Sequence, residues 1–141
     1  MKWQVVLKKI KIRKFTPVTA GNEKIKRKKK LRNILKKKIG KKLLGIKKSA
    51  EKHSLCIDVC FYLQESKKLG RSKKDLDNLL KILFDTLSDN MVHGQKPVKG
   101  LGIMRDDSYI NKIICEKKPV KFKNQEGLDL KILKNPSKLL G

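Results

Sequence analysis

Two apolar patterns with different periods lie next to each other along the chain. Apolar side chains occupy every odd position from Leu55 to Leu63, and polar or small ones occupy the even positions. That alternation predicts a strand over residues 55–64. From Leu76 to Leu87 the apolar residues recur at steps of three and four, which predicts a helix with one apolar stripe that ends near Ser88. Because the stripe needs an apolar partner, we expect this helix to pack on a sheet that contains the strand.

Weaker patterns predict the remaining elements. Residues 3–12 alternate with a change of phase at Lys8 and Lys9, as a strand with a bulge does. Residues 103–104 and 110–115 read as a strand or hairpin, residues 128–132 as a final strand, residues 88–102 as a long loop, and residues from Asn135 as a frayed end. The sequence therefore predicts one α+β domain over residues 1–141, a mixed β-sheet with two main helices packed on it.

The charge of the chain predicts a polyanionic partner. Lys and Arg number 38 against 13 Asp and Glu, giving a formal net charge of +25. Residues 24–48 hold 14 of these cations and no acid, at a roughly helical apolar spacing that is interrupted at Gly40 and Gly45. We expect this segment to bind a phosphate backbone, although a solvated face in a generally lysine-rich proteome is the alternative. The candidate phosphate contacts are Lys28, Lys29, Lys30, Arg32, Lys36, Lys37, Lys73 and Lys74.

A charge of this size suits nucleic acid or an anionic membrane surface, and of the two we expect nucleic acid and no membrane partner. No apolar run approaches the roughly 20 residues that a membrane span needs. The first residues enter an alternating segment directly, without an apolar signal-peptide core. We therefore expect a cytoplasmic protein that associates with the nucleoid and is not secreted.

The few carboxylates are unusually placed. Asp75 and Asp77 stand at the start of the leucine-rich helix, and their plain interpretation is a capping box with Ser72 and an ion pair between Asp77 and Lys81. If residues 75–77 are helical, the two carboxylates point about 200° apart around the axis. If they are still extended, both carboxylates point to one side and form half of a metal site.

A third carboxylate would come from Asp106 or Asp107, which point to opposite sides if they lie in a strand. Carboxylates about 4 Å apart repel by roughly 4 kcal/mol at an effective dielectric of 20, so such a cluster needs a cation. Hard carboxylate oxygens favour Mg²⁺ or Mn²⁺. These ions polarise phosphoryl oxygens and generate hydroxide, which is the chemistry of phosphodiester hydrolysis.

At these residues the sequence resembles the RusA-type Holliday-junction resolvases. The matching run is Lys74-Asp75-Leu76-Asp77-Asn78-Leu79-Leu80-Lys81, then Phe84-Asp85-Thr86-Leu87, then Asp106-Asp107-Ser108 before a strand, within residues 54–116. The resemblance implies a RusA-like fold and a homodimeric, Mg²⁺-dependent endonuclease that nicks a four-way DNA junction symmetrically. It also implies that Asp75, Asp77 and Asp107 are metal ligands, that Lys81 is a catalytic cation, and that Asp106 supports them.

The alternative is a non-catalytic, basic nucleic-acid-binding protein, comparable to a small ribosomal or chromatin component. Its carboxylates would be helix caps and salt-bridge partners. A less specific nuclease that also cuts flaps or forks lies between these two functions.

Overall fold

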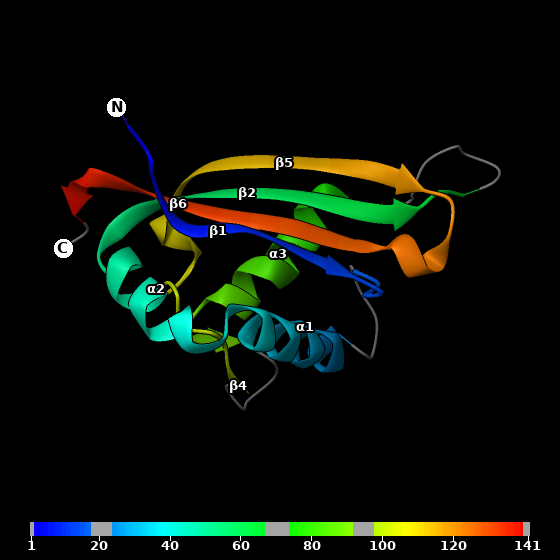
Figure 1. Cartoon of the computed structure of the whole chain (residues 1–141), viewed down its shortest axis with the longest axis horizontal. Coiled ribbons are helices and arrows are strands. Elements are labelled where there is room, and N and C mark those ends of the chain that lie inside the picture. Colours follow the sequence, from blue (N-terminus) through cyan, green and yellow to red (C-terminus); the bar gives the residue numbers. More distant parts are fainter. Residues whose placement is uncertain (1, 18–23, 67–73, 92–97, 140–141) are drawn as a thin grey trace.

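The structure is a computed structural model that describes every residue except 1, 18–23, 67–73, 92–97 and 140–141. Its strands are β1 (Gln4–Arg13), β2 (His53–Gln64), β3 (Asn90–Met91), β4 (Val98–Lys99), β5 (Ile110–Val120) and β6 (Gly127–Leu139). Its helices are α1 (Lys24–Ile39), α2 (Leu43–Ala50) and α3 (Leu76–Leu87), with 3₁₀ turns at Gly40–Lys42, Asp107–Tyr109 and Lys123–Gln125. The long strands form one layer and the helices form another (Figure 1).

The long strands form one mixed sheet in the order β1-β6-β2-β5 within the described chain. β2 runs parallel to β5 and antiparallel to β6, and β6 also pairs antiparallel with β1. The register of β1 shifts between Val5 and Leu7 and again between Leu7 and Ile10, close to the predicted bulge. With α1 and α3 as the two main helices, this arrangement confirms the predicted α+β fold.

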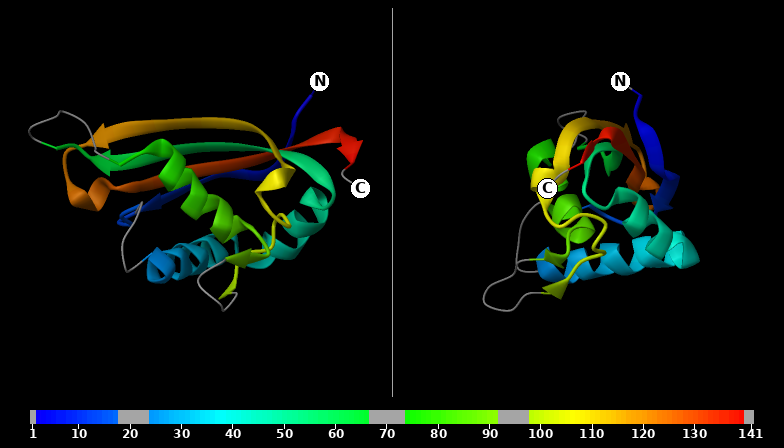
Figure 2. Two further views of the ribbon diagram at one scale, coloured as in Figure 1. Left: turned by 180° about the vertical axis from the view of Figure 1, so that it is seen from behind. Right: turned by 90° about the vertical axis from the view of Figure 1, so that its left-hand side faces the viewer.

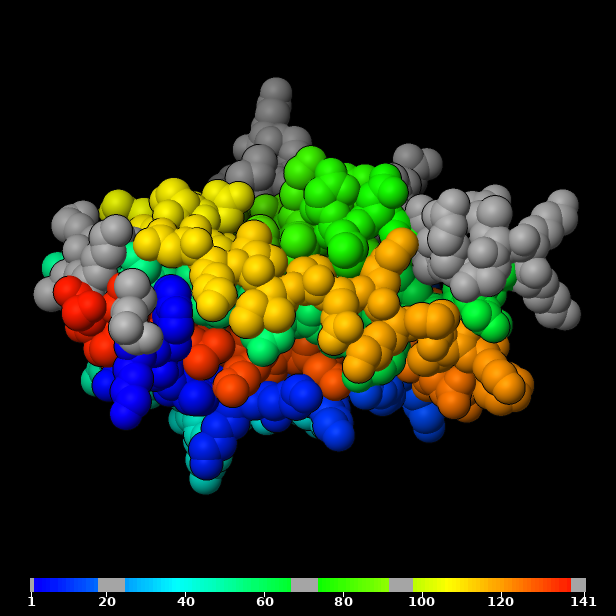
Figure 3. Space-filling model, turned by 90° about the horizontal axis from the view of Figure 1, so that it is seen from above, coloured from blue at the N-terminus to red at the C-terminus, as the bar shows by residue number. Residues whose placement is uncertain are grey.

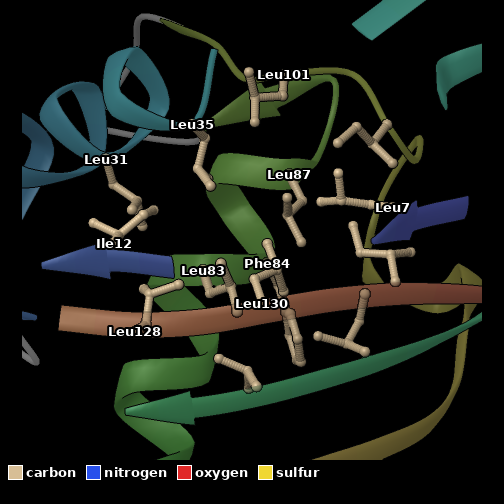
Figure 4. Close-up of a cluster of buried hydrophobic side chains, with 14 of the residues drawn as sticks. Leu7, Ile12, Leu31, Leu35, Leu83, Phe84, Leu87, Leu101, Leu128 and Leu130 are labelled. Atoms are coloured by element: carbon tan, nitrogen blue, oxygen red, sulfur yellow. The ribbon is translucent and has the colours of Figure 1, made fainter. Parts of the chain in front are cut away.

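The hydrophobic core lies between the sheet and the helices (Figure 4). The odd residues of β2, from Leu55 to Leu63, are at most 1% exposed, as their alternation predicts. Leu83 and Leu87 of α3 belong to the same cluster on the helix side of the sheet, and Leu31 and Leu35 of α1 extend it. All three helices lie on this one face of the sheet (Figure 2). None of the described helices is both long enough and apolar enough to cross a bilayer.

Two predicted elements differ in the structure. Of the predicted strand or hairpin, residues 110–115 do form a strand, the first half of β5. They do not form a hairpin with residues 103–104, because Asp107–Tyr109 make a 3₁₀ turn and β5 pairs with β2. Met104 contributes only an isolated bridge to Ser88. The frayed end predicted from Asn135 is also wrong, since β6 continues to Leu139 and Asn135 is 3% exposed. The Asn135 side chain accepts hydrogen bonds from Ser137, which holds this part of the strand in place.

A polar cluster lies on the sheet face opposite the helices. Arg13 Nη1 donates to Asp129 Oδ1 at 2.8 Å, and the Tyr62 hydroxyl donates to Asp129 Oδ2 at 2.9 Å. The Arg13 guanidinium lies 4.1 Å from the centre of the Tyr62 ring, within cation–π range. Burial acts to raise the pKa of Asp129, but the hydrogen bonds from Arg13 and Tyr62 outweigh it and the pKa is lowered.

Burial and the hydrogen bond to Asp129 raise the pKa of Tyr62 to about 12. The neutral phenol therefore stabilises the folded state fully below about pH 10, and this contribution is lost as the pH rises towards 12. We expect a tyrosinate absorbance transition near pH 12 that Tyr62→Phe lacks and that Asp129→Asn moves to lower pH. A Tyr62→Phe titration that matches the wild type would show that this hydroxyl is not held by Asp129.

Candidate functional site

The first predicted pair of carboxylates stands at the start of α3. Asp75 is the N-cap residue in extended conformation, and its side chain makes no capping hydrogen bond. Asp77 lies in the first turn, and both residues are exposed at the positive end of the helix dipole. The capping box is therefore wrong, because the helix starts after Asp75, and Ser72 lies outside the described residues.

Lys81 follows Asp77 by one helical turn and is exposed. The expected ion pair between these two side chains is not formed in the described part of the chain. Both charged groups are therefore exposed, Asp77 in the first turn and Lys81 near the middle of the 12-residue helix.

The second pair, Asp106 and Asp107, lies in the turn before β5. Asp106 is extended and its carboxylate accepts hydrogen bonds from the Ser108 hydroxyl and from the Ser108 backbone N–H. These bonds lower the pKa of Asp106. Asp107 starts the 3₁₀ turn. The two side chains therefore do not lie in a strand and do not alternate between its two faces.

The two pairs are at opposite ends of α3 within one chain. The helix has 12 residues, which at about 1.5 Å per residue makes it roughly 18 Å long. Lys117 Nζ donates to the Lys74 carbonyl at 2.9 Å, so the Asp75 end of α3 lies beside the second half of β5. Asp107 lies just before β5, and Ile110, the first residue of β5, is about 23 Å from Lys117 along the strand.

The structure therefore does not bring Asp75, Asp77 and Asp107 together in one chain. Among the described residues, no three His, Cys, Asp or Glu side chains are placed so that they could hold a metal ion. The predicted ligands do not fit a Mg²⁺ or Mn²⁺ ion as they stand in a single copy.

Backbone hydrogen bonds build the surroundings of the Asp106–Asp107 turn. The segment from Gly100 to Ile103 lies along the C-terminal end of α3, where Leu101 N donates to Thr86 O at 2.8 Å and Ile103 N donates to Leu87 O at 2.9 Å. These bonds satisfy carbonyls that a helix end leaves unpaired. A Cβ atom at Gly100 would lie 2.1 Å from the Ser88 carbonyl oxygen, so only glycine permits this close approach.

This packing creates an acidic hollow of about 410 Å³. Four of the 13 acidic residues of the chain line it, together with Ser88, Asn90 and Arg105. The four are Asp85, Asp89, Asp106 and Asp107. Sequence reasoning missed Asp89, whose position depends on contacts between distant segments and has no local signal.

A second hollow of about 520 Å³ adjoins the first and carries mainly positive charge. Its cations are Lys47 and Lys48 of α2, Lys52 in the turn after α2, and Arg105 in the turn before β5. The two hollows share Asp89 and Arg105. A phosphate group fits the charge of the second hollow.

Seven of the eight predicted phosphate contacts fall into three groups. Lys29, Lys30, Lys36 and Lys37 are exposed on α1. Arg32 is half-buried and donates to the Lys99 carbonyl at 2.8 Å, so it ties α1 to β4. Lys73 lies outside the described residues, and the half-buried Lys74 donates to the Pro17 carbonyl. Burial lowers the pKa of Lys74.

Lys28 corrects one prediction. Its side chain is 3% exposed and forms an ion pair with Asp85, which joins α1 to α3. Because the ammonium group faces the protein interior, Lys28 is not a surface contact for phosphate. No family model, curated protein or solved structure matches the chain.

Proposed function

We propose that this protein is a Mg²⁺-dependent endodeoxyribonuclease that resolves four-way DNA junctions by paired, symmetric nicks and works as a homodimer. The observation that carries the proposal is the placement of its few carboxylates. Asp75 and Asp77 stand at one end of α3 and Asp106 and Asp107 at the other, in a chain with a net charge of +25. The excess of cations supplies affinity for DNA that does not depend on its sequence.

The dimer is part of the proposal because one copy separates the predicted ligands. In a dimer whose two-fold axis is perpendicular to α3, two α3 helices that lie side by side run antiparallel. The Asp75 end of α3 in the first copy then lies beside the Asp107 end in the second copy. By symmetry, the Asp75 end in the second copy lies beside the Asp107 end in the first. Two equivalent sites result, which is what symmetric nicking of two strands requires. Lys81 follows Asp77 by one turn, near the middle of α3, and its charge can stabilise negative charge that develops on a phosphate bound beside Asp77.

The direct test incubates the purified protein with a labelled four-way junction and with a matched duplex. The assay is run with Mg²⁺, with Mn²⁺ and with excess chelator. We expect paired nicks on the junction with either ion, no cleavage with chelator, and no cleavage of the duplex. Cutting of flaps and forks at a similar rate would replace junction specificity with a broader structure-selective activity.

A second candidate is a basic nucleic-acid-binding protein without catalysis. The observation that favours it is that two of the carboxylates already have partners within the chain, since Asp85 pairs with Lys28 and Asp106 accepts from Ser108. Binding of both DNA substrates without cleavage under any metal condition would support this function over the nuclease.

A further inference from the structure

β5 forms one edge of the sheet and carries exposed apolar side chains. Within the described residues it pairs only with β2, along one of its two sides. Ile113 and Ile114 in its middle are 45% and 46% exposed. A long edge strand with exposed apolar residues is a template for pairing with another strand. Figure 3 shows β5 beside α3 at this side of the molecule.

The backbone groups that β5 offers on its free side follow from its hydrogen bonds. Glu65 N donates to the Val120 carbonyl at 3.1 Å, so Val120 faces β2. The register of β5 against β2 is regular from Lys112 to Val120, and successive residues of a strand present their N–H and C=O to alternate sides. The odd-numbered residues from Asn111 to Pro119 therefore turn their backbone N–H and C=O groups away from β2, towards the free edge. Pro119 has no N–H, and its backbone faces away from β2, so the pairing of β5 with β2 loses no hydrogen bond there.

We propose that the β5 edges of two copies pair antiparallel about a two-fold axis at Ile114, which makes one continuous sheet across the dimer. In this register Lys112 lies opposite Glu116 of the second copy, twice by symmetry, and Ile114 lies opposite its own equivalent. Next to it, Ile113 of one copy and Cys115 of the other form a hydrogen-bonded pair, because the backbone groups of both residues face the free edge. Moving the axis by one residue in either direction loses the Lys112–Glu116 pairs and sets Ile114 opposite Glu116 or Lys112.

The faces of the sheet agree with this register. Ile114 is the partner of Asp58 in β2, so Lys112, Ile114 and Glu116 share the sheet face that the helices do not cover. Opposite charges directly across an antiparallel pair stabilise it, and like charges destabilise it. The exposed isoleucines become the centre of the interface, with one complementary ion pair on each side.

The pairing also deepens the proposed function, and this consequence rests on that function. α3 contacts β5 and is the helix nearest to this edge (Figures 2 and 3). The proposed register sets Lys117, which holds the start of α3, opposite Asn111 of the second copy. Asn111 follows the Asp106–Asp107 turn, so the two ends of α3 that carry the predicted ligands meet across the axis.

The first test is a cross-link. Ile114→Cys is made in a background with Cys60→Ser and Cys115→Ser, and Lys112→Cys in the same background is the matched control. At a non-hydrogen-bonded antiparallel pair the Cα atoms lie about 4.5 Å apart, within disulfide range. We expect mild oxidation to convert Ile114→Cys to a covalent dimer. Lys112→Cys should remain monomeric on a non-reducing gel, because its equivalents lie about 13 Å apart along the strands.

The second test exchanges the charges. Lys112→Glu sets two carboxylates opposite each other on both sides of the axis, and we expect the dimer dissociation constant at low salt to rise about tenfold by sedimentation equilibrium. Lys112→Glu combined with Glu116→Lys should restore the wild-type value. Both side chains are exposed, so the fold of each copy tolerates the changes.

A monomeric wild type, no cross-link at residue 114, equal cross-linking at residue 112, or failure of the double exchange would each overturn the pairing. A cross-linked dimer that binds but does not cut a junction with Mg²⁺ would leave the pairing standing and reject the nuclease. Cleavage by a protein that does not cross-link at residue 114 would keep the nuclease and reject this interface.

Discussion

Asp77→Asn and Asp107→Asn should each lose at least about 100-fold of the junction-cleavage rate, because each removes a carboxylate that the proposed site needs. Junction binding should stay the same or tighten, since a negative charge near DNA phosphates is deleted. Both side chains are exposed, so the free energy of unfolding should change by less than about 0.5 kcal/mol. Asp58→Asn, on the sheet face away from the helices, is the matched control and should cut normally.

Mixing the two inactive variants tests whether each site is shared between copies. In a mixed dimer, one site combines both substitutions and the other combines the intact Asp77 of one copy with the intact Asp107 of the other. If subunits exchange at random, about a quarter of the wild-type sites return, and the product is mainly a single nick. The measurement is the cleavage rate of the co-refolded mixture, compared with the rates of the two single variants. A mixture as inactive as its components would show that Asp77 and Asp107 do not act together across the dimer.

The parts of the fold that were predictable are those encoded by neighbours in sequence. The alternation from Leu55 to Leu63 lies within β2, and the leucine spacing from Leu76 matches the bounds of α3. Both segments bury one face, so periodicity carries the information. The strand order β1-β6-β2-β5 has no such local signal. Neither does the extension of β6 beyond Asn135, where a buried polar side chain anchors the strand and pairing with β2 resumes after a register shift.

The candidate site was predictable in composition but not in geometry. The carboxylates at the start of α3 and before β5 stand out in a basic chain, yet their separation depends on how α3 runs along β5. Lys28 shows a signal that was overlooked. It precedes Leu31 by three positions and Leu35 by seven, so helical periodicity places it on the buried face of α1. The density of cations in residues 24–48 hid that position.

The Lys28–Asp85 pair should respond very differently to the loss of each partner. Lys28 is 3% exposed at the boundary of α1 and α3, whereas the Asp85 side chain is 39% exposed. Asp85→Ala leaves a buried ammonium group without this carboxylate, which should lower the free energy of unfolding by about 3 kcal/mol. Lys28→Met keeps the buried volume and leaves a carboxylate that reaches water, so its effect should stay within about 1 kcal/mol.

Urea unfolding of the two single variants and the double variant separates the pair from other effects of Asp85. If the buried charge is the cause, Asp85→Ala should cost little in the Lys28→Met background, and the melting temperature that falls by roughly 10 °C in the single variant should recover. An equal loss in both backgrounds would assign the cost of Asp85→Ala to the acidic hollow instead. Because Asp85 belongs to the segment that resembles the resolvases, recovery in the double variant would give this carboxylate a structural reason to be there, namely to hold the basic helix α1 against α3.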